Sequence, residues 1–315
     1  MKVYDKVTLF LPTTEIGRNF TVEDCLDDGS VKYDAKTGAY KSCSGTVLGM
    51  AVKQSEKGVS VTGSFPKLLY DNNYTPMTRK GAREVVSLIS DALGLEIGNA
   101  FVTCLEFGTA FPMSKPPGAY IRLLGKLPYF DRLVMESGKA TSLYYQQKAK
   151  GREVCFYDKT AEVTGKGGTI PFLLDNMLRY ELRYNNRIGA KLGFKGVTAS
   201  KLSQVAFYAK LKSELLNTYM AIKKQNTGRA EERLLTADTP KKCLEAIVSC
   251  YLSDGGQKKI SEIIGKLKSV GKLDRYAITR IETKLYGLYS DGADGESKEQ
   301  LEELTEAVKN AAFNG

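Results

Sequence analysis

The segment 178–184 constrains the fold of this chain more than any other segment. It reads Leu178-Arg179-Tyr180-Glu181-Leu182-Arg183-Tyr184, so charged residues alternate with apolar and aromatic ones. Side chains of a β-strand point alternately to the two faces of its sheet, so Arg179, Glu181 and Arg183 share one face. The pattern predicts a strand with one apolar face and one charged face.

The charged face of this strand allows two interpretations. The three side chains can simply be solvated at the surface of the sheet. Alternatively, a carboxylate between two guanidinium groups can hold a divalent cation while the arginines neutralise phosphate oxygens. The segment by itself leaves both interpretations open.

The chain contains no histidine and no tryptophan. The missing histidine excludes Ser-His and Cys-His nucleophiles, a histidine general base and every zinc or iron site that needs imidazole. Glu106 is a candidate metal ligand because it is the only acid in the apolar strand predicted over 100–107. Together with Glu181 it would supply two oxygen ligands that suit Mg²⁺ or Mn²⁺. The alternative is an acid at a strand end that faces water.

A tyrosine can act as a nucleophile where no histidine is present. Tyr157 stands in the segment Phe156-Tyr157-Asp158-Lys159, at the end of a predicted hairpin strand. It can attack phosphorus if a metal polarises the phosphate and Lys159 eases the loss of the phenolic proton. Because the chain has 18 tyrosines, an ordinary core or surface aromatic is the competing interpretation.

The net charge of +10 is unevenly distributed along the chain. Residues 1–237 carry 34 basic and 23 acidic residues, whereas residues 238–315 carry 12 and 13. Residues 148–195 alone hold ten basic residues against five acids, with tyrosines between them, as in grooves that bind single-stranded nucleic acid. The alternative is a basic surface without a ligand. We expect the basic part of the chain to bind a polyanion.

Strand and helix patterns alternate up to about residue 225, and from residue 238 onward the patterns are helical. We therefore expect an α+β domain over 1–225, then a charged linker over 226–237 and a small all-α accessory domain over 238–315. The helices of that domain are expected to serve dimerisation or duplex binding, and their near-neutral charge favours protein contacts. The strands are predicted near 3–11, 47–52, 59–65, 100–107, 143–145, 153–157 and 177–184, and long helices near 77–93 and 198–224.

The chain carries no sequence signal for export or for a membrane. No apolar run approaches the ~18 residues of a membrane span, and the first residues lack an apolar signal segment. The six cysteines show no CxxC spacing, which predicts free thiols in a reducing compartment. We expect a cytoplasmic protein that does not bind membranes.

Five segments occur in an order and spacing that resembles a known family. Over residues 1–225 the chain resembles the replication initiators of filamentous phages, the gene II/X proteins, and those of small rolling-circle plasmids. The helices from residue 238 take no part in this resemblance. The segments are Val3-Tyr4-Asp5-Lys6-Val7-Thr8-Leu9, Gly58-Val59-Ser60-Val61-Thr62-Gly63-Ser64, the strand 102–107, Phe156-Tyr157-Asp158-Lys159 and Leu178-Arg179-Tyr180-Glu181-Leu182-Arg183.

The resemblance implies a metal-dependent, site-specific single-strand DNA endonuclease that initiates rolling-circle replication by nicking and joining. Members of the family cut one strand of an origin with a tyrosine, keep the 5′ phosphate as a phosphotyrosine and leave a 3′-hydroxyl for a polymerase. The implied fold is an antiparallel sheet flanked by helices. It is related to the HUH-type replication endonucleases, in a branch without their histidine pair. Host replication proteins are further partners that such a reaction implies.

The resemblance also assigns roles to individual residues. Glu106 and Glu181 become the ligands of Mg²⁺ or Mn²⁺, Tyr157 the nucleophile and Lys159 its catalytic partner. Arg179 and Arg183, like Lys159, become phosphate or metal-site partners.

Other residues are candidates from the sequence itself. Together with Arg179 and Arg183, the residues of the basic segment expected to contact DNA are Arg152, Lys148 and Arg187. Tyr144 and Tyr145, in the strand before Tyr157, and Tyr208, on the following helix, are rival nucleophiles.

The chain departs from the family pattern in one strand. The family usually reads Thr-Arg-x-Asp where this chain has Thr103-Cys104-Leu105-Glu106, so the arginine is missing and the acid is longer by one methylene. The alternative function is therefore a catalytically weakened origin-binding or regulatory DNA-binding protein.

Overall fold

The computed structural model describes residues 4–16, 20–73, 75, 77–137, 140–167, 176–224, 237–253, 256–290 and 295–313. Within these ranges ten strands form one antiparallel sheet in the order β2-β3-β4-β5-β1-β6-β10-β9-β8-β7. This confirms the predicted α+β class and its antiparallel sheet. The strands are β1 (Tyr4–Pro12), β2 (Ser30–Tyr33), β3 (Tyr40–Val47), β4 (Met50–Ser55), β5 (Gly58–Ser64), β6 (Phe101–Pro112), β7 (Asp131–Ser137), β8 (Ala140–Gln147), β9 (Arg152–Asp158) and β10 (Met177–Asn185).

The described helices and strands keep the predicted order, but one long helix differs and several short elements were not predicted. Those elements are the strands β2 and β3 and the short helices Phe65–Tyr70, Lys159–Gly165 and Ile188–Leu192. Instead of one helix over 198–224, a 3-10 turn at Ala199–Ser203 precedes a helix that starts at Val205. Strand β7 was missed because all seven of its residues are exposed, so it lacks apolar alternation. The α-helices are α1 (Phe65–Tyr70), α2 (Arg79–Leu93), α3 (Pro117–Arg122), α4 (Lys159–Gly165), α5 (Ile188–Leu192), α6 (Val205–Ala221), α8 (Pro240–Ser253), α9 (Gly256–Val270), α10 (Arg275–Ser290) and α11 (Gly295–Phe313).

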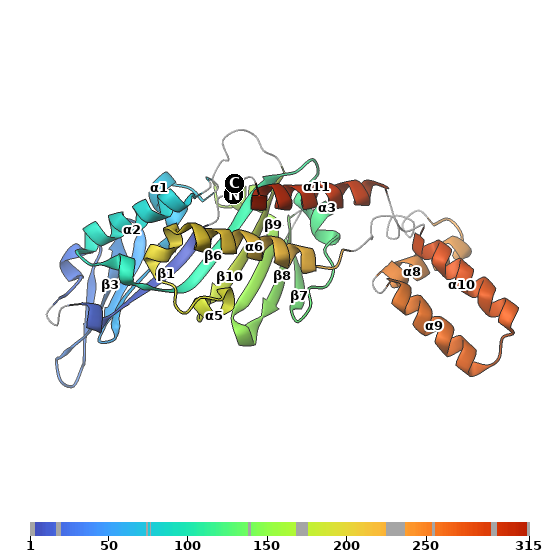
Figure 1. Cartoon of the computed structure of the whole chain (residues 1–315), viewed down its shortest axis with the longest axis horizontal. Helices are drawn as coiled ribbons and strands as arrows, with labels where there is room; N and C mark the ends of the chain where they lie inside the picture. Colours follow the sequence, from blue (N-terminus) through green and yellow to red (C-terminus); the bar gives the residue numbers. More distant parts are fainter. Residues whose placement is uncertain are drawn as a thin grey trace.

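One face of the sheet is apolar and packs against helices, with α6 crossing the central strands in Figure 1. The apolar residues of β10 point into this layer and are fully buried. Tyr180 stacks on Phe156 with ring centroids 4.4 Å apart, and its hydroxyl donates to the Leu215 carbonyl of α6 at 2.8 Å. Each large apolar side chain buried there stabilises the fold by about 1.5–3 kcal/mol. This layer fixes β10 and the orientation of its opposite, charged face.

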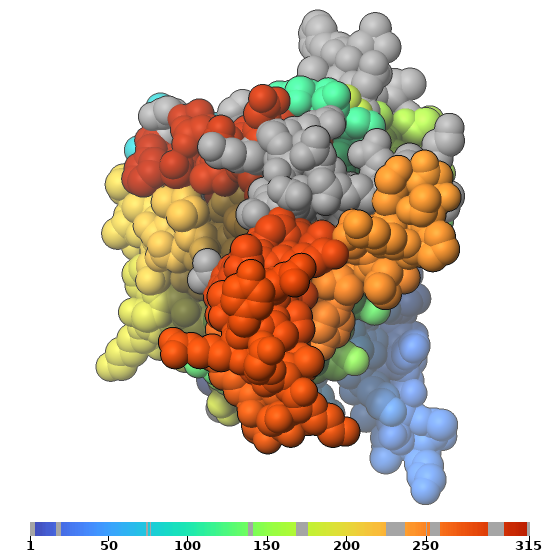
Figure 2. All heavy atoms as spheres, turned by 90° about the vertical axis from the view of Figure 1, so that its right-hand side faces the viewer, coloured from blue at the N-terminus to red at the C-terminus, as the bar shows by residue number. Residues whose placement is uncertain are grey.

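The C-terminal helices pack in two different places. Leu304 and Val308 of α11 belong to the main core, and the Tyr219 hydroxyl of α6 lies 2.9 Å from the Thr305 hydroxyl of α11. Helices α8, α9 and α10, which we call the arm, have a separate small core that includes Leu252 and Ile260. Figures 1 and 2 show α11 beside α6, and in Figure 1 the arm projects away from the sheet.

The domain boundaries at 225 and 238 stay a prediction, and most of the proposed linker lies outside the described residues. No helix in the described part of the chain is long and apolar enough to cross a membrane. The five cysteines for which the structure places the side chain are all free thiols.

Candidate functional site

The charged face of the sheet is centred on β10, which lies between β6 and β9. On β6, Gly108 is paired with Glu181 and Ala110 with Arg179. A Cβ atom at Gly108 would lie 2.2 Å from the Tyr180 carbonyl oxygen, so only glycine allows this close approach of the two strands. The small residues of β6 also leave room for the Arg179 side chain to extend across β6 towards β1.

Glu181 is buried at the centre of this face and accepts hydrogen bonds on both carboxylate oxygens. Its Oε2 accepts from Arg179 Nε and from the Tyr157 hydroxyl, both at 3.1 Å. Its Oε1 accepts from Arg183 Nη2 at 3.0 Å and from Arg183 Nε at 3.3 Å. Burial raises the pKa of Glu181, but the two guanidinium groups outweigh it and leave that pKa below its usual value.

Arg179 connects Glu181 to the first strand of the chain. Its Nη2 donates to Asp5 Oδ2 of β1 at 3.0 Å, and Asp5 also accepts from the Ser64 hydroxyl of β5 at 3.1 Å. Burial raises the pKa of Asp5, although the nearby Arg179 opposes this shift. The charged face is therefore a buried ion network that crosses several strands, not a set of solvated side chains.

Arg183 is the arginine of the network that reaches the surface. Its Nη1 donates to Glu153 Oε1 at 2.9 Å, and its Nε lies 3.7 Å from Glu106 Oε2. Among the acids of this network, Glu106 has the longest distance to an arginine nitrogen. Burial raises the pKa of Glu106 to about 7, with Arg183 acting against the shift and Glu181 and Asp5 adding to it. Glu106 changes its charge near neutral pH.

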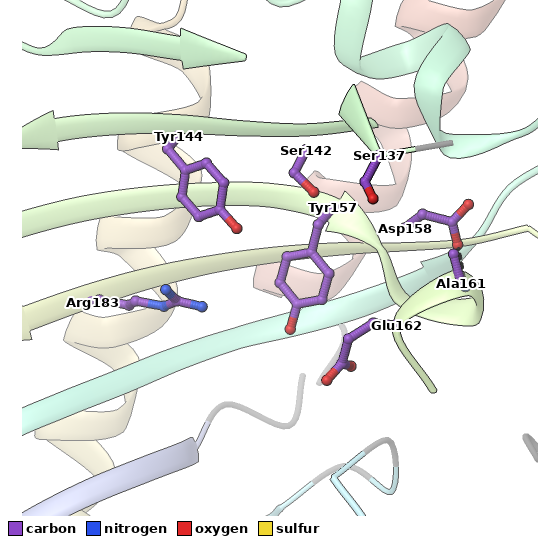
Figure 3. Close-up of a pocket in the computed structure, with 8 residues that line it drawn as sticks. All are labelled: Ser137, Ser142, Tyr144, Tyr157, Asp158, Ala161, Glu162 and Arg183. Carbon is purple, nitrogen blue, oxygen red and sulfur yellow. Dashed lines mark hydrogen bonds between the residues drawn. The ribbon is translucent and has the colours of Figure 1, made fainter. Parts of the chain in front are cut away.

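Tyr157 sits where this network opens into a cleft of about 500 Å³. Figure 3 shows the rings of Tyr157 and Tyr144 on neighbouring strands, with Arg183 on one side and Glu162 on the other. Burial and the neighbouring Glu181 raise the pKa of the Tyr157 hydroxyl, so it is protonated in the free protein. The residues that line the cleft are Ser137, Ser142, Tyr144, Tyr157, Asp158, Ala161, Glu162 and Arg183.

Lys159 is fully buried at the first position of α4. Asp158 fixes the start of that helix by accepting from the Ala161 backbone N–H at 2.8 Å. The Lys159 ammonium donates to Asn73 Oδ1 at 3.0 Å and pairs with Glu162, and it lies 6.0 Å from the centre of the Tyr157 ring. Lys159 is therefore close to Tyr157, with its charge neutralised by Glu162.

The rival nucleophiles divide between the two faces of the sheet. Tyr144 lies on the charged face and lines the same cleft as Tyr157. Tyr145 is buried on the opposite face, where its hydroxyl donates to the Gly125 carbonyl at 2.6 Å. Tyr208 belongs to the main core, with its ring 5.9 Å from that of Tyr4. The geometry thus brings Tyr157 and Tyr144 to the cleft and keeps Tyr145 and Tyr208 away from it.

The residues predicted to contact DNA do not all lie in one place. Arg179 is buried in the ion network, and Arg152 is engaged by Glu214 at 2.9 Å and by the rings of Phe130 and Tyr184. Arg183 lines the Tyr157 cleft. Lys148 and Arg187 are exposed at the other end of β9 and β10. A second cleft of about 500 Å³ lies at that end, lined by Ala149, Lys150, Arg152, Asn186, Arg187, Ala190 and Lys191.

Three acids of the site were missed by sequence reasoning: Asp5, Glu153 and Glu162. Asp5 had a signal, because it is a lone acid in the apolar strand 3–11, the same pattern that singled out Glu106. Glu153 and Glu162 had none, since acids at those positions are ordinary on a strand end and a short helix.

The predicted metal ligands fit a divalent cation by chemistry but not by their present arrangement. Carboxylate oxygens suit Mg²⁺ or Mn²⁺, yet both oxygens of Glu181 are taken up by arginines and Tyr157. Among the described residues, no group of three or more His, Cys, Asp or Glu side chains is arranged to hold a metal ion. Glu106 and Glu181 as a ligand pair stay a prediction.

Comparison with known proteins gives the class of this chain. Residues 3–210 match a family model that describes the N-terminal part of the phage gene II replication-associated protein. The match defines the class as the phage replication-associated proteins. The chain belongs to this family. The resemblance to rolling-circle replication initiators is confirmed at that level, and such an initiator acts at a DNA origin.

The chain was also compared with solved structures and with curated proteins. The rolling-circle replication initiator protein from Geobacillus stearothermophilus is similar at 14% identity and a TM-score of 0.40, over 76% of this chain and 90% of that one. No curated protein matches.

Proposed function

We propose that this replication initiator is a nicking-joining enzyme that cuts single-stranded origin DNA with Tyr157. The observation that carries the proposal is the Tyr157 hydroxyl, which lines an open cleft and donates to Glu181 at 3.1 Å with Arg183 beside it. A nucleophile, an acceptor for its proton and a cation for phosphate are thus in one place. Tyr144 lines the same cleft but donates no hydrogen bond to Glu181 among the contacts of the described residues.

The proposed reaction is a transesterification at phosphorus. The Tyr157 oxygen forms a bond to phosphorus while the bond between phosphorus and the 3′ oxygen breaks. The phenolic proton passes first to Glu181 Oε2 and ends on the departing 3′ oxygen, which leaves as a hydroxyl. The 5′ phosphate stays on Tyr157, so the energy of the phosphodiester is kept for rejoining.

The free protein holds this pair of groups in its unreactive protonation state. Two arginines make Glu181 a weak base, and burial makes Tyr157 a weak acid. A DNA phosphate in the cleft would attract Arg183, whose side chain is 28% exposed, and take its hydrogen bonds away from Glu181. Glu181 would then become more basic, so DNA binding itself would prepare Tyr157 for attack.

Mg²⁺ or Mn²⁺ is the cofactor expected from the family, and Glu106 is the acid of the network least committed to arginine. Divalent ions stabilise charge on a transferring phosphoryl group. Because the oxygens of Glu181 are occupied, we assign the ion no step of the mechanism.

The experiment uses a labelled single strand of the cognate origin, incubated with the full chain and Mn²⁺. The native protein should form a covalent adduct that survives denaturing electrophoresis, and Tyr157→Phe should lower its yield at least about 1,000-fold. Tyr144→Phe is the matched control, because it removes a hydroxyl from the same cleft, and its yield should stay within about threefold. An adduct that forms equally well with Tyr157→Phe would overturn the assignment.

The alternative function is a DNA-binding regulator that has lost its chemistry. Cys104 favours it, because this residue stands where the family has arginine and its thiol donates to Asn185 Oδ1 at 3.0 Å. This function predicts salt-dependent DNA binding that is unchanged in Glu106→Gln and Glu181→Gln and insensitive to a chelator. An adduct that a chelator abolishes would rule it out.

A further inference from the structure

The near-neutral charge of residues 238–315 hides two parts of opposite sign. Residues 238–290, which contain the arm, carry ten basic and six acidic residues, whereas residues 291–315 carry two basic and seven acidic ones. The acidic part contains α11, which packs on the main core. The arm is therefore basic, although residues 238–315 as a whole are near neutral.

The basic charge of the arm is concentrated at one end, which we call the tip. Between Glu262 and Glu282 the sequence has five basic residues and a single acid, Asp274. The tip consists of the last turns of α9, the loop that follows it and the start of α10. Its exposed basic side chains are Lys266, Lys268, Lys272 and Arg275.

The acid of the tip caps a helix and forms no ion pair with these cations among the described residues. Asp274 Oδ1 accepts from the backbone N–H of Ala277 at 2.7 Å and so caps the start of α10. Elsewhere on the arm lysines are paired, as in Lys242 with Asp238 at 2.8 Å and Lys284 with Glu245 at 3.0 Å. Among the residues that the structure describes, no carboxylate pairs with the four tip cations. Unpaired cations gathered in one place repel each other, so an anionic partner is favoured there.

The shape of the tip indicates which anion it fits. The tip is the end of a helical hairpin that projects away from the sheet in Figure 1, and it carries the ring of Tyr276, which is 75% exposed. Single-stranded nucleic acid is bound in grooves where several aromatic rings stack on the bases. A projecting helix pair with unpaired cations instead matches the phosphate rows and wide major groove of a duplex.

We propose that the arm tip contacts the phosphate backbone of duplex DNA and gives this initiator a second DNA-binding surface, separate from the Tyr157 cleft. The inference rests on the proposed function in so far as both take DNA as the partner. The cleft receives the strand that is cut, and the tip holds the adjacent double helix. Lys266, Lys268, Lys272 and Arg275 supply the phosphate contacts, and Tyr276 packs against the sugar-phosphate backbone.

The test compares two quadruple variants of the full chain that lose the same charge. The tip variant is Lys266→Gln, Lys268→Gln, Lys272→Gln and Arg275→Gln. The control is Lys36→Gln, Lys57→Gln, Lys67→Gln and Lys80→Gln, four exposed lysines scattered over the part of the chain that contains the sheet. Affinity for a 30-base-pair duplex is measured by fluorescence anisotropy between about 50 and 200 mM salt. Over this range phosphate contacts make the affinity fall strongly with salt concentration. Adduct formation on single-stranded origin DNA is measured in parallel.

The tip variant should bind the duplex at least about tenfold more weakly and reduce the salt slope by about 3.6, because each of the four lost phosphate contacts removes about 0.9. The control should bind within about twofold of the native chain, and both variants should form the covalent adduct normally. Equal losses in the two variants, or no loss in the tip variant, would overturn the proposal. A loss confined to single-stranded DNA would overturn it too. If the tip variant binds the duplex normally but forms no adduct, this inference is wrong. The role of Tyr157 is not affected by that result, because Tyr157→Phe tests it separately.

Discussion

The two faces of the central sheet use the same strands for different purposes. On the helix-covered face, Tyr180 and Leu182 are buried among other apolar groups, and their contribution to stability is that of a well-packed core. On the other face, Arg179, Glu181 and Arg183 are held by charge, and Glu181 is almost as deeply buried. A buried ion network gives little net stability but is costly to break, because each removed partner leaves a charge unpaired. The comparison teaches that one face stabilises the fold, while the other holds charged groups in fixed positions with little net gain in stability.

The largest effect is expected at Glu181. Glu181→Gln keeps the shape of the side chain but removes the negative charge between two arginines and the acceptor for the Tyr157 proton. We expect adduct formation to fall at least about 1,000-fold and the free energy of unfolding to fall by about 3 kcal/mol. Adduct yield and urea unfolding check the two effects. Glu153→Gln is the control at a more exposed position, with less than about 1 kcal/mol expected; an equal loss in both variants would contradict the central role of Glu181.

On the apolar face stability and activity should separate. Leu182→Ala removes a fully buried side chain next to Glu181 in the sequence, so the free energy of unfolding should fall by about 2–5 kcal/mol. The adduct rate per folded molecule should stay within about twofold, because Leu182 points away from the cleft. Leu133→Ala on the exposed strand β7 should cost less than about 0.5 kcal/mol. If Leu182→Ala slows the chemistry of folded molecules, the two faces are not independent.

The pH dependence of stability should distinguish Glu106 from its neighbours. Its pKa is raised from about 4.5 to about 7 in the folded chain, so the folded state holds the proton more tightly than the unfolded one. The contribution of Glu106 to the free energy of unfolding is therefore fully present below about pH 4.5 and declines as the pH rises to about 7. The decline is about 2 kcal/mol after allowance for partial exposure. Glu106→Gln should remove this decline and be more stable than the native chain at pH 8. Urea unfolding at pH 5 and pH 8, in chelator, checks it; an unchanged decline would show that another group, such as Asp5, is responsible.

The smallest effect is expected where α11 docks. Glu303 accepts from the backbone N–H of Ser114 at 2.8 Å and from its hydroxyl at 2.7 Å, and it pairs with the buried Tyr120 hydroxyl. These bonds lower the pKa of Glu303 although burial opposes them, so its contribution is present above its unfolded pKa and lost as the pH falls through the folded one. Glu303→Gln should cost about 1 kcal/mol at pH 7 and nothing at a pH where the Glu303 carboxyl is protonated in both the folded and the unfolded native chain. Thermal unfolding checks this, with exposed Glu306→Gln as control; a loss that persists at low pH would mean that shape matters more than charge.

The central strands could be predicted from sequence because their signals are local. Alternation over 178–184 placed Arg179, Glu181 and Arg183 on one face, and the segment 156–159 placed Tyr157 at a strand end. The alternation also predicted Glu181 between its two arginines, but the partners on other strands could not be predicted, because they are distant in the sequence. Arg179 reaches Asp5 of β1 only because Gly108 and Ala110 leave space on the intervening β6, and sequence periodicity contains no information on such space.

The C-terminal helices show the same limit on a larger scale. Their existence followed from apolar spacing, but nothing in that spacing distinguishes a helix that packs on a separate core from one that returns to the first. Leu304 of α11 and Ile260 of α9 are equally buried, in two different cores. The roles of the predicted site residues stay predictions, since position alone does not establish chemistry.

The docking of α11 has a practical consequence for how the chain can be shortened. A fragment that stops near residue 237 would expose the surface under Leu304 and Val308, and loss of two such side chains from the core removes several kcal/mol, about half the stability of an ordinary domain. An internal excision that joins α6 to α11 through a short flexible connection would spare that surface and delete only the arm. The arm is in this sense a removable insert, and the last helix of the chain is a part of the main body.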